Sequence, residues 1–384
     1  MILTKCAHCA AQLALLSPRC VKCKTRYCDR TCQANHWRLG HSQICRTIED
    51  GGGAEKCNAD KKYKEAVAVA VEACAEDTRG QTCYICTEAV HWKTNEGLVR
   101  MCACRGTSGF AHVTCLALQA ETLVAGGEGR DLSLAAKNAQ WHRWRACGLC
   151  KQWYHGVVSC ALGWACWKTY LGRPQRDEIR SMAMTLLGGG LHKVRAFEAA
   201  LVVYEVELAT ARRFSPDDQR VMLTIQTNVA SCLEALGRDV DTLALWRDIY
   251  VRTKELSGTT HRDTLTSADN LALFLTKRGQ TAECKSMLRE IIEACPPRVL
   301  DTNIDVLSLR DRYASCLFKE RNCFGAAKMY RDLERAAVRT LGVAHPFTKN
   351  VQYNLEAAES NVAMILATHR WAVGLQRAWR RRRA

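Results

Sequence analysis

Hydrophobic and polar positions in the second half of the chain recur with a period of 42 residues, which appears when Gln219, His261, Asn303 and His345 are aligned. The aligned columns hold apolar, aromatic or small residues: Leu223, Leu265, Leu307; Ala230, Ala272, Ala314; Leu233, Leu275, Leu317; Tyr204, Trp246, Leu288, Tyr330. Small residues where two helices cross and a bulky residue on the second helix are typical of a helix-turn-helix unit that buries its apolar face by stacking. The pattern therefore predicts a C-terminal α-solenoid.

Glycine completes the repeat and divides the rest of the chain. Gly237 and Gly279 share the column expected at the turn, where the next repeat has Arg321. In the first half, 61–75 is rich in alanine and valine and predicts a helix, and we expect 153–170 to form a helix that packs the residues before it onto those after it. The glycine run 51–53 indicates a linker, and the run 188–190 predicts an interruption in the next helical segment. The fold class predicted is mainly α.

Cysteine changes this picture, because the chain has 23 of them and the first 45 positions hold eight potential zinc ligands in four pairs. The pairs are Cys6 and Cys9, Cys20 and Cys23, Cys28 and Cys32, His41 and Cys45. Each pair turns two ligands toward one point, and a tetrahedral zinc ion takes four, so two zinc ions are predicted. Spacing alone does not decide how the pairs combine. His36 competes with His41, but only His41 has the expected distance to Cys45, so we favour His41.

A second series of eight potential ligands begins at position 83, and it predicts two further zinc ions, four in total. Its pairs are Cys83 and Cys86, Cys102 and Cys104, His112 and Cys115, Cys147 and Cys150. The last two pairs are separated by 31 residues, including the glycine-rich stretch 125–129. Nine cysteines lie outside the two series; we leave Cys160 and Cys166 unassigned, and interpret those of the second half as small buried residues.

The first series resembles a MYND finger over residues 6–45, since Tyr27-Cys28, Cys32-Gln33, Trp37 and His41-x-x-x-Cys45 follow in family order. The resemblance implies that the pairs cross-brace. One zinc would then be held by Cys6, Cys9, Cys28 and Cys32, and the other by Cys20, Cys23, His41 and Cys45. In that family the finger typically holds a proline-rich peptide of a partner protein.

The second series resembles the RING-CH variant of the RING finger over 83–150, where four cysteines precede one histidine and three cysteines. The resemblance implies one zinc on Cys83, Cys86, His112 and Cys115, and another on Cys102, Cys104, Cys147 and Cys150. It also implies that Ile85 matches the apolar position that grips a ubiquitin-conjugating enzyme in ligase-competent members. A zinc-stabilised protein-binding module without catalysis is the alternative interpretation.

The repeats of the second half resemble the tetratricopeptide repeats of kinesin light chains. The similarity covers about 195–365 and rests on the period of 42 and on repeat starts such as Leu341-Gly342-x-x-His345-Pro346. The resemblance implies a concave face for peptides or protein helices. A purely structural spacer is the alternative.

The expected cellular compartment and the net charge limit the functions that the sequence allows. No signal peptide or stretch of 18 uncharged apolar residues is apparent, and the metal-type spacings predict reduced thiols, so we expect a cytoplasmic or nuclear protein without a transmembrane segment. Four Zn²⁺ on 14 thiolates would lower the formal charge from +16 to about +10. Part of the excess positive charge lies in the arginines at 370, 377 and 380–383. This cluster is compatible with a nuclear-import signal, a lipid- or calmodulin-binding helix, a site for nonspecific nucleic-acid binding or a solvated end of the chain.

These observations predict a domain order and a function. We expect a MYND-like finger at 1–50, a linker and helix at 51–82, a RING-CH-like finger with a Trp-rich helix at 83–172, helical repeats at 177–365 and a basic tail at 366–384. The favoured function is a zinc-binding adaptor between protein partners, and a RING-type ubiquitin ligase is the alternative. Nucleic-acid binding is disfavoured because acidic residues are mixed among the basic ones. The 37 residues between the two series leave no room for the SET domain of MYND-containing methyltransferases.

Overall fold

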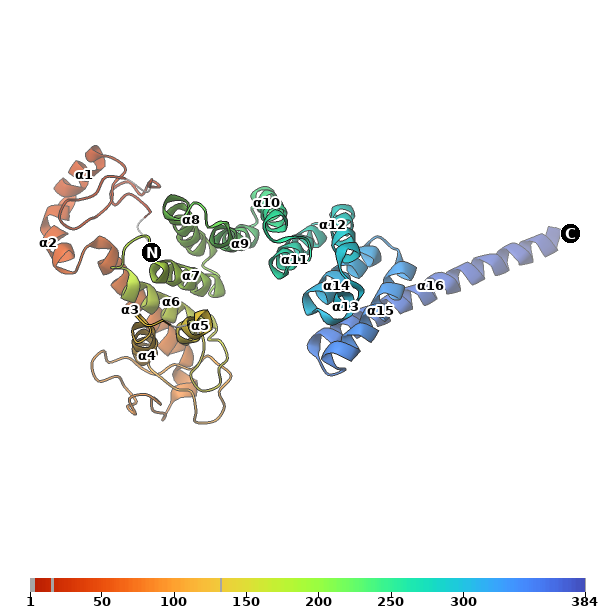
Figure 1. Cartoon of the computed structure of the whole chain (residues 1–384), viewed down its shortest axis with the longest axis horizontal. Coiled ribbons are helices and arrows are strands. Elements are labelled where there is room, and N and C mark those ends of the chain that lie inside the picture. Colours follow the sequence, from red (N-terminus) through yellow and green to blue (C-terminus); the bar gives the residue numbers. More distant parts are fainter. Residues whose placement is uncertain (1–3, 15–16, 132, 384) are drawn as a thin grey trace. The chain divides into compact units, whose positions relative to one another are not determined.

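The computed structural model describes residues 4–14, 17–131 and 133–383, and it divides into two compact units, Met1–Arg238 and Asp239–Ala384. Among these described residues regular structure is helical, and extended pairing is limited to four isolated bridges. The first unit contains the following helices, of which Figure 1 labels those written α: α1 Arg30–His36, η1 Trp37–His41, α2 Ser42–Asp50, α3 Ala54–Thr78, α4 Val113–Ala125, α5 Leu134–Trp141, η2 His142–Trp144, α6 Gly156–Tyr170, α7 Glu178–Lys193, α8 Phe197–Phe214, α9 Gln219–Ala235. The fold is mainly α, as the sequence predicts.

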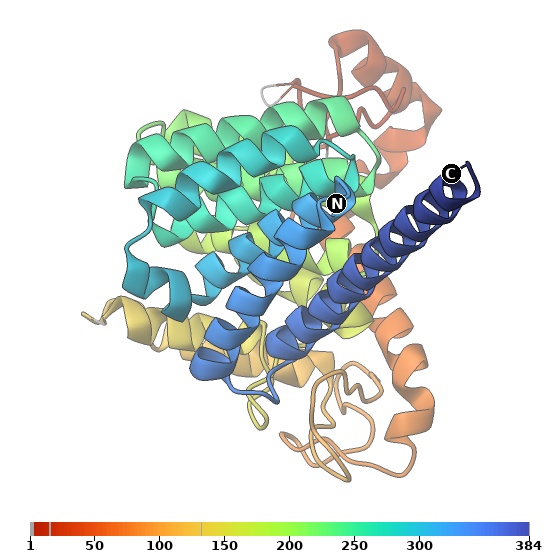
Figure 2. The same cartoon turned by 90° about the vertical axis from the view of Figure 1, so that its right-hand side faces the viewer.

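The helices of the second unit form antiparallel hairpins and end in one long helix (Figures 1 and 2). They are α10 Asp239–Ser257, α11 Arg262–Lys277, α12 Thr281–Ala294, α13 Pro297–Thr302, α14 Ile304–Lys319, α15 Cys323–Leu341 and α16 Pro346–Arg383. α14 packs against α11, α12 and α15, and α15 packs against α16. Each hairpin thus buries its apolar face against its neighbours, which is the architecture of an α-solenoid.

The period of 42 coincides with the helices. Positions 219, 261, 303 and 345 stand at or just before the start of α9, α11, α14 and α16. His261 and Asn303 cap their helices by accepting backbone N–H donations, Asn303 from Asp305 and Val306. The alanine column is fully buried at Ala230, Ala272 and Ala314, where helices cross closely.

The backbone conformation at the turn explains the glycine column and shows that the repeat also includes an earlier turn. Gly237 and Gly279 have φ of 72° and 74°, in the left-handed region that favours glycine. Arg321, in the same column, keeps this conformation with φ of 63°, and Arg195, 42 residues before Gly237, has φ of 61°. The turn geometry is therefore retained where the glycine is not, and the column reaches back to the α7–α8 turn.

Helix α6 forms the centre of the first unit. It packs against α3, α4 and α7, and the side chains from Val158 to Trp167 are all buried. Trp167 of α6 and Trp144 of η2 are almost completely buried, and Tyr170 of α6 packs edge-on against Trp144. The expected helix at 153–170 begins three residues later, because Trp153 pairs with Ala146 in an isolated bridge that closes the last knuckle. The expected packing of the finger onto the following helices is present.

The glycine run 188–190 does not interrupt a helix, so that prediction was wrong. All three glycines lie inside α7. A Cβ added at Gly190 would come within 2.9 Å of Cys160 Cα and Ser159 O in α6, and one added at Gly188 would come within 2.5 Å of the Tyr204 ring in α8. At Gly188 and Gly190, the neighbouring helices approach α7 too closely for a side chain.

Candidate zinc centres

The 16 predicted ligands come together in four groups of four, and in each group the possible ligand atoms lie within 4.8 Å of one another. The groups are Cys6, Cys9, Cys28, Cys32; Cys20, Cys23, His41, Cys45; Cys83, Cys86, His112, Cys115; Cys102, Cys104, Cys147, Cys150. In both fingers the first pair joins the third pair and the second joins the fourth. This is the interleaved pairing that the family resemblances imply and that spacing left open.

The first group is built by a tight turn and the start of α1. The chain reverses around Cys6 and Cys9, closed by the bridge between Lys5 and Gln12 and by Ala10 at a φ of 60°. Asp29 caps α1 by accepting from the backbone N–H of Cys32, which fixes Cys28 and Cys32 one helical turn apart. The Sγ atoms of Cys9 and Cys28 are 3.6 Å apart. Tetrahedral zinc with bonds of about 2.3 Å separates its sulfur ligands by about 3.8 Å, so the spacing fits a zinc ion.

The second group is more deeply buried and includes His41. His41 Nε2 lies 3.4 Å from Cys23 Sγ, and Cys20 Sγ lies 3.7 Å from Cys45 Sγ. His36 lies outside the group, and its Nδ1 is 3.0 Å from the hydroxyl of Tyr27 while its ring stacks on that of His41. Burial, and then the neighbouring His36, lower the pKa of His41, which favours the neutral imidazole that a metal needs.

The third group contains a histidine held by both ring nitrogens. His112 Nδ1 is 3.3 Å from Cys86 Sγ and 3.6 Å from Cys115 Sγ, while Nε2 lies 3.5 Å from the carbonyl oxygen of Ala89. A hydrogen bond from Nε2 to that carbonyl leaves Nδ1 with its lone pair directed at the metal position. Burial lowers the pKa of His112.

Glu96 supports this third group, and sequence reasoning missed it. The buried Glu96 carboxylate accepts from the backbone N–H and the hydroxyl of Thr114, at 3.1 and 2.5 Å, and so caps α4 between His112 and Cys115. The Tyr63 hydroxyl of α3 lies 2.9 Å from the Thr114 hydroxyl and ties the cap to that helix. Seventeen residues separate Glu96 from Thr114, and no sequence motif marks such a pair.

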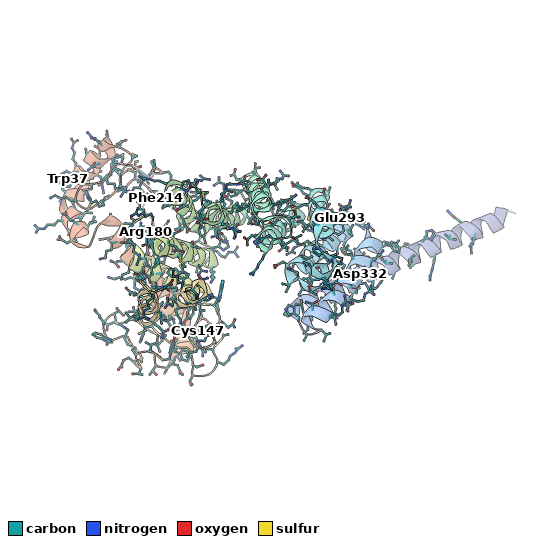
Figure 3. All side chains as sticks on the ribbon, viewed as in Figure 1. Trp37, Cys147, Arg180, Phe214, Glu293 and Asp332 are labelled. Carbon is teal, nitrogen blue, oxygen red and sulfur yellow. The ribbon has the colours of Figure 1, made fainter. Side chains whose placement is uncertain are left out.

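The fourth group brings Cys147, labelled in Figure 3, within 3.7 Å of Cys104, although 43 positions separate them in the chain. Gly109 leaves room for the Cys104 side chain in this group. This residue has a φ of 88°, and a Cβ there would lie 2.6 Å from Cys104 Cβ and 2.8 Å from its Sγ. The long segment between Cys115 and Cys147 forms α4, α5 and η2, so it does not separate the ligands.

Backbone donors favour the thiolate form of Cys6 in the first group and of Cys150 in the fourth. Burial raises the pKa of Cys6, but backbone N–H groups of Cys9, Cys28 and His8 outweigh it and lower the pKa to about 6. In the fourth group burial likewise opposes the backbone N–H of Gln152, and the pKa of Cys150 is lowered to about 7. Thiolates less than 4 Å apart repel one another, and a divalent cation removes that repulsion.

Each group offers four protein ligands, which is the closed coordination of structural zinc rather than the open coordination of catalytic zinc. The residues therefore fit four zinc ions. Zinc at these positions would hold the turns and helices of each finger together, and it would have no position left for water or substrate.

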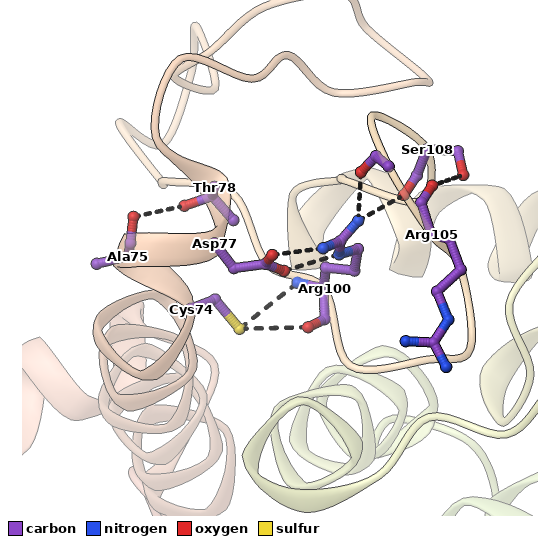
Figure 4. Close-up of polar contacts among 8 residues, drawn as sticks. Cys74, Ala75, Asp77, Thr78, Arg100, Arg105 and Ser108 are labelled. Carbon is purple, nitrogen blue, oxygen red and sulfur yellow. Dashed lines mark hydrogen bonds and ion pairs between the residues drawn. The ribbon is translucent and has the colours of Figure 1, made fainter.

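Arg100 fastens the second finger to α3 (Figure 4). Its guanidinium makes a bidentate ion pair with Asp77 of α3, with Nε to Oδ2 at 2.7 Å, and it donates to the carbonyl of Gly106 at 2.6 Å. Cys74 Sγ accepts from the backbone N–H of Arg100, and the guanidinium lies 4.2 Å from the Phe110 ring centroid. No motif marks this clamp, because its residues are ordinary and distant in sequence.

The remaining singled-out residues lie outside these groups. Cys160 and Cys166 are buried within α6, and burial raises the pKa of Cys160 to about 11, so both are apolar packing residues there. Ile85 is half-buried in the first turn of the second finger. Among the described residues, no helix combines the length and the apolar character needed to cross a membrane.

Comparison with known proteins gives matches to parts of the chain. No curated protein matches it. The solved TPR-like repeats of a putative kinesin light chain from Podosopora anserina are 15% identical, with a TM-score of 0.44 over 51% of this chain and 93% of that one. BtubC (BKLC) from P. vanneervenii is 15% identical, with a TM-score of 0.47 over 53% of this chain and 83% of that one. The family model of the MYND finger matches residues 6–45, so the chain contains a MYND zinc finger.

Proposed function

We propose that the protein is a cytoplasmic or nuclear adaptor that joins protein partners through its zinc fingers and its helical repeats. The observation that carries the proposal is that all four ligand groups are closed, with four protein ligands each, in a chain that also contains a stack of helical hairpins. Metal in such groups shapes a surface and does no chemistry. We assign the 16 grouped residues as zinc ligands. We assign residues 1–50 and 83–172 as the two fingers and residues 177–365 as the repeat region.

The MYND finger offers an exposed apolar surface for one partner. Leu39 is 75% exposed, and Trp37, at the start of η1 (Figure 3), and Ile44 are each nearly half exposed. A flat aromatic side chain with aliphatic neighbours is the surface that a proline-rich segment packs on, because such a segment is already extended and loses little entropy on binding. We propose a proline-rich peptide as the ligand of this surface.

The test separates the surface from the fold. Trp37→Ala should weaken binding of proline-rich peptides at least tenfold while zinc content stays at four ions, whereas Cys28→Ser should abolish binding and release zinc. Trp92→Ala is the matched control, because Trp92 is also exposed, at 75%, but lies in the second finger. Affinity purification of the same variants should show one group of partners lost with Trp37 and another retained through the repeats. Equal recovery of every partner by Cys28→Ser would contradict the adaptor function.

A ubiquitin ligase is the second candidate, and it rests on the RING-CH-like order of four cysteines, one histidine and three cysteines in residues 83–150. In a ligase, Ile85 would contact the ubiquitin-conjugating enzyme, and the transfer chemistry would belong to that enzyme. An autoubiquitination assay with a panel of conjugating enzymes tests this. Transfer that is lost in Ile85→Ala, with zinc retained, would establish the ligase; the absence of transfer by the wild type would exclude it for that panel.

A further inference from the structure

Among the residues that the structure describes, the second half of α16 has no packing partner within its own unit. Val351, Leu355 and Ala358 are buried against α15, and Val362 is the last side chain to pack on that cluster. Beyond it, α16 continues past α15 (Figure 1), and the side chains described between Ala363 and Arg377 are exposed except for the half-buried Val373.

This exposed half carries apolar side chains on more than one side. Met364, Trp371 and Leu375 are 60%, 70% and 50% exposed, and at about 100° per residue they fall within a stripe about 40° wide. Ile365 and Leu366, each more than 40% exposed, lie about 100° and 160° around the helix from the centre of that stripe. A helix that is apolar on opposite sides requires a partner that covers both.

The charge of the segment is of one sign. Between Ser360 and Ala384 the sequence holds six arginines and no aspartate or glutamate. Arg370 and Arg377 are exposed about 120° and 140° around the helix from the centre of that stripe, on the side of Leu366. The complementary surface is therefore acidic on its rim and apolar within.

We propose that the α16 segment from Ala363 to Arg377 is a docking helix for an acidic, EF-hand protein of the calmodulin type, whose two lobes enclose a basic amphipathic helix. Such lobes present flexible apolar grooves rimmed by carboxylates, and they can cover Trp371 from one side and Leu366 from the other. A membrane surface is flat and covers one side of a helix, so it would leave Ile365 or Leu366 in water.

Calorimetric titration of the full chain with purified calmodulin, at about 0.15 M salt and saturating calcium, tests the proposal. We expect one calmodulin to bind per chain. Trp371→Ala should weaken binding at least tenfold, because a large aromatic anchor dominates such interfaces. Tyr353→Ala is the matched control: Tyr353 is 71% exposed on the same helix, outside the proposed segment, and its loss should change affinity less than twofold.

Charge is tested in the same way. Arg377→Glu should weaken binding several-fold, whereas Lys349→Glu, an exposed position near the start of α16, should not. A second arm uses vesicles of phosphatidylserine and phosphatidylcholine. Binding to these vesicles without binding to calmodulin would overturn the proposal in favour of an anionic membrane. Equal calmodulin affinity of Trp371→Ala and the wild type would overturn it as well. Circular dichroism should show both Trp371→Ala and Tyr353→Ala fully folded, because both side chains are exposed.

Discussion

Two adjacent glycines in α7 should respond to the same substitution with opposite signs. An alanine at Gly190 would place its Cβ 2.9 Å from Cys160 Cα and 2.9 Å from Ser159 O, both of them backbone atoms of α6. At Gly189 the nearest atom is the Tyr204 hydroxyl oxygen at 3.7 Å, which is ordinary van der Waals contact.

The magnitudes follow from two opposing effects. Alanine in a helix interior is favoured over glycine by up to about 1 kcal/mol, so Gly189→Ala should raise the free energy of unfolding by about 0.5–1 kcal/mol. At Gly190 the same gain is opposed by overpacking, which costs about 1–3 kcal/mol when the neighbours cannot move aside. Because the neighbours are helix backbone, we expect a net loss of about 1–2 kcal/mol.

Urea unfolding of zinc-saturated protein, followed by tryptophan fluorescence, measures both changes. Trp167 of α6 and Trp144 of η2 are buried and report on this unit. The midpoint should rise for Gly189→Ala and fall for Gly190→Ala. If the urea midpoint shifted in the same direction for both variants, the close approach of α6 and α7 would not be the reason for a glycine at Gly190.

Three further predictions concern metal, pH and the repeat turns. His41→Ala should lower the zinc content from four ions to three, while His36→Ala should leave four, as measured by atomic emission; the opposite result would reassign the fourth pair. Burial raises the pKa of Glu207 from 4.5 to about 7, so the folded state binds more protons than the unfolded state between these pH values, and stability should fall by up to roughly 3 kcal/mol as pH rises through that window. Glu207→Gln should remove that fall in urea midpoints measured from pH 4.5 to 8. Arg321→Gly should stabilise the second unit by up to about 1 kcal/mol, and Gly279→Ala, where a Cβ meets no atom within 4 Å, should destabilise it by a similar amount in thermal unfolding; no change in either would rule out strain at these turns.

The ligand groups and the repeat could be predicted from the sequence because both are encoded locally. A Cys-x-x-Cys turn or a residue pair one helical turn apart, as at Cys28 and Cys32, positions two ligands whatever the rest of the chain does. The repeat is visible because every unit solves the same packing problem with the same residue sizes, as Ala230, Ala272 and Ala314 show. The joining of pairs came only with the family resemblance, since four pairs of equal chemistry can combine in several ways.

The rest could not be predicted because it depends on elements that are distant in sequence. The run 188–190 has the composition of a helix breaker, and only the positions of α6 and Tyr204 show that it permits close packing. The left-handed turn at Arg195 carries no glycine to mark it. Similarly, Arg100 and Asp77 become partners only once α3 and the second finger are both in place.

Helix α3 gives the two fingers a common support whose middle part does not depend on the metal sites of either finger. At its start, the backbone N–H of Ala54 donates to the carbonyl of Cys23 in the MYND finger, at 2.8 Å. Near its end, Asp77 holds Arg100 of the second finger. Between them Val67 and Ala70 are buried, α3 packs on α6, and Asp60 pairs with Lys168 of α6 at 2.9 Å. Because α6 holds this middle part by apolar contacts, loss of zinc from one finger removes only the contacts that α3 makes with that finger. One finger can therefore unfold and refold while the other stays folded and able to bind its partner. The proposed adaptor function requires this independence.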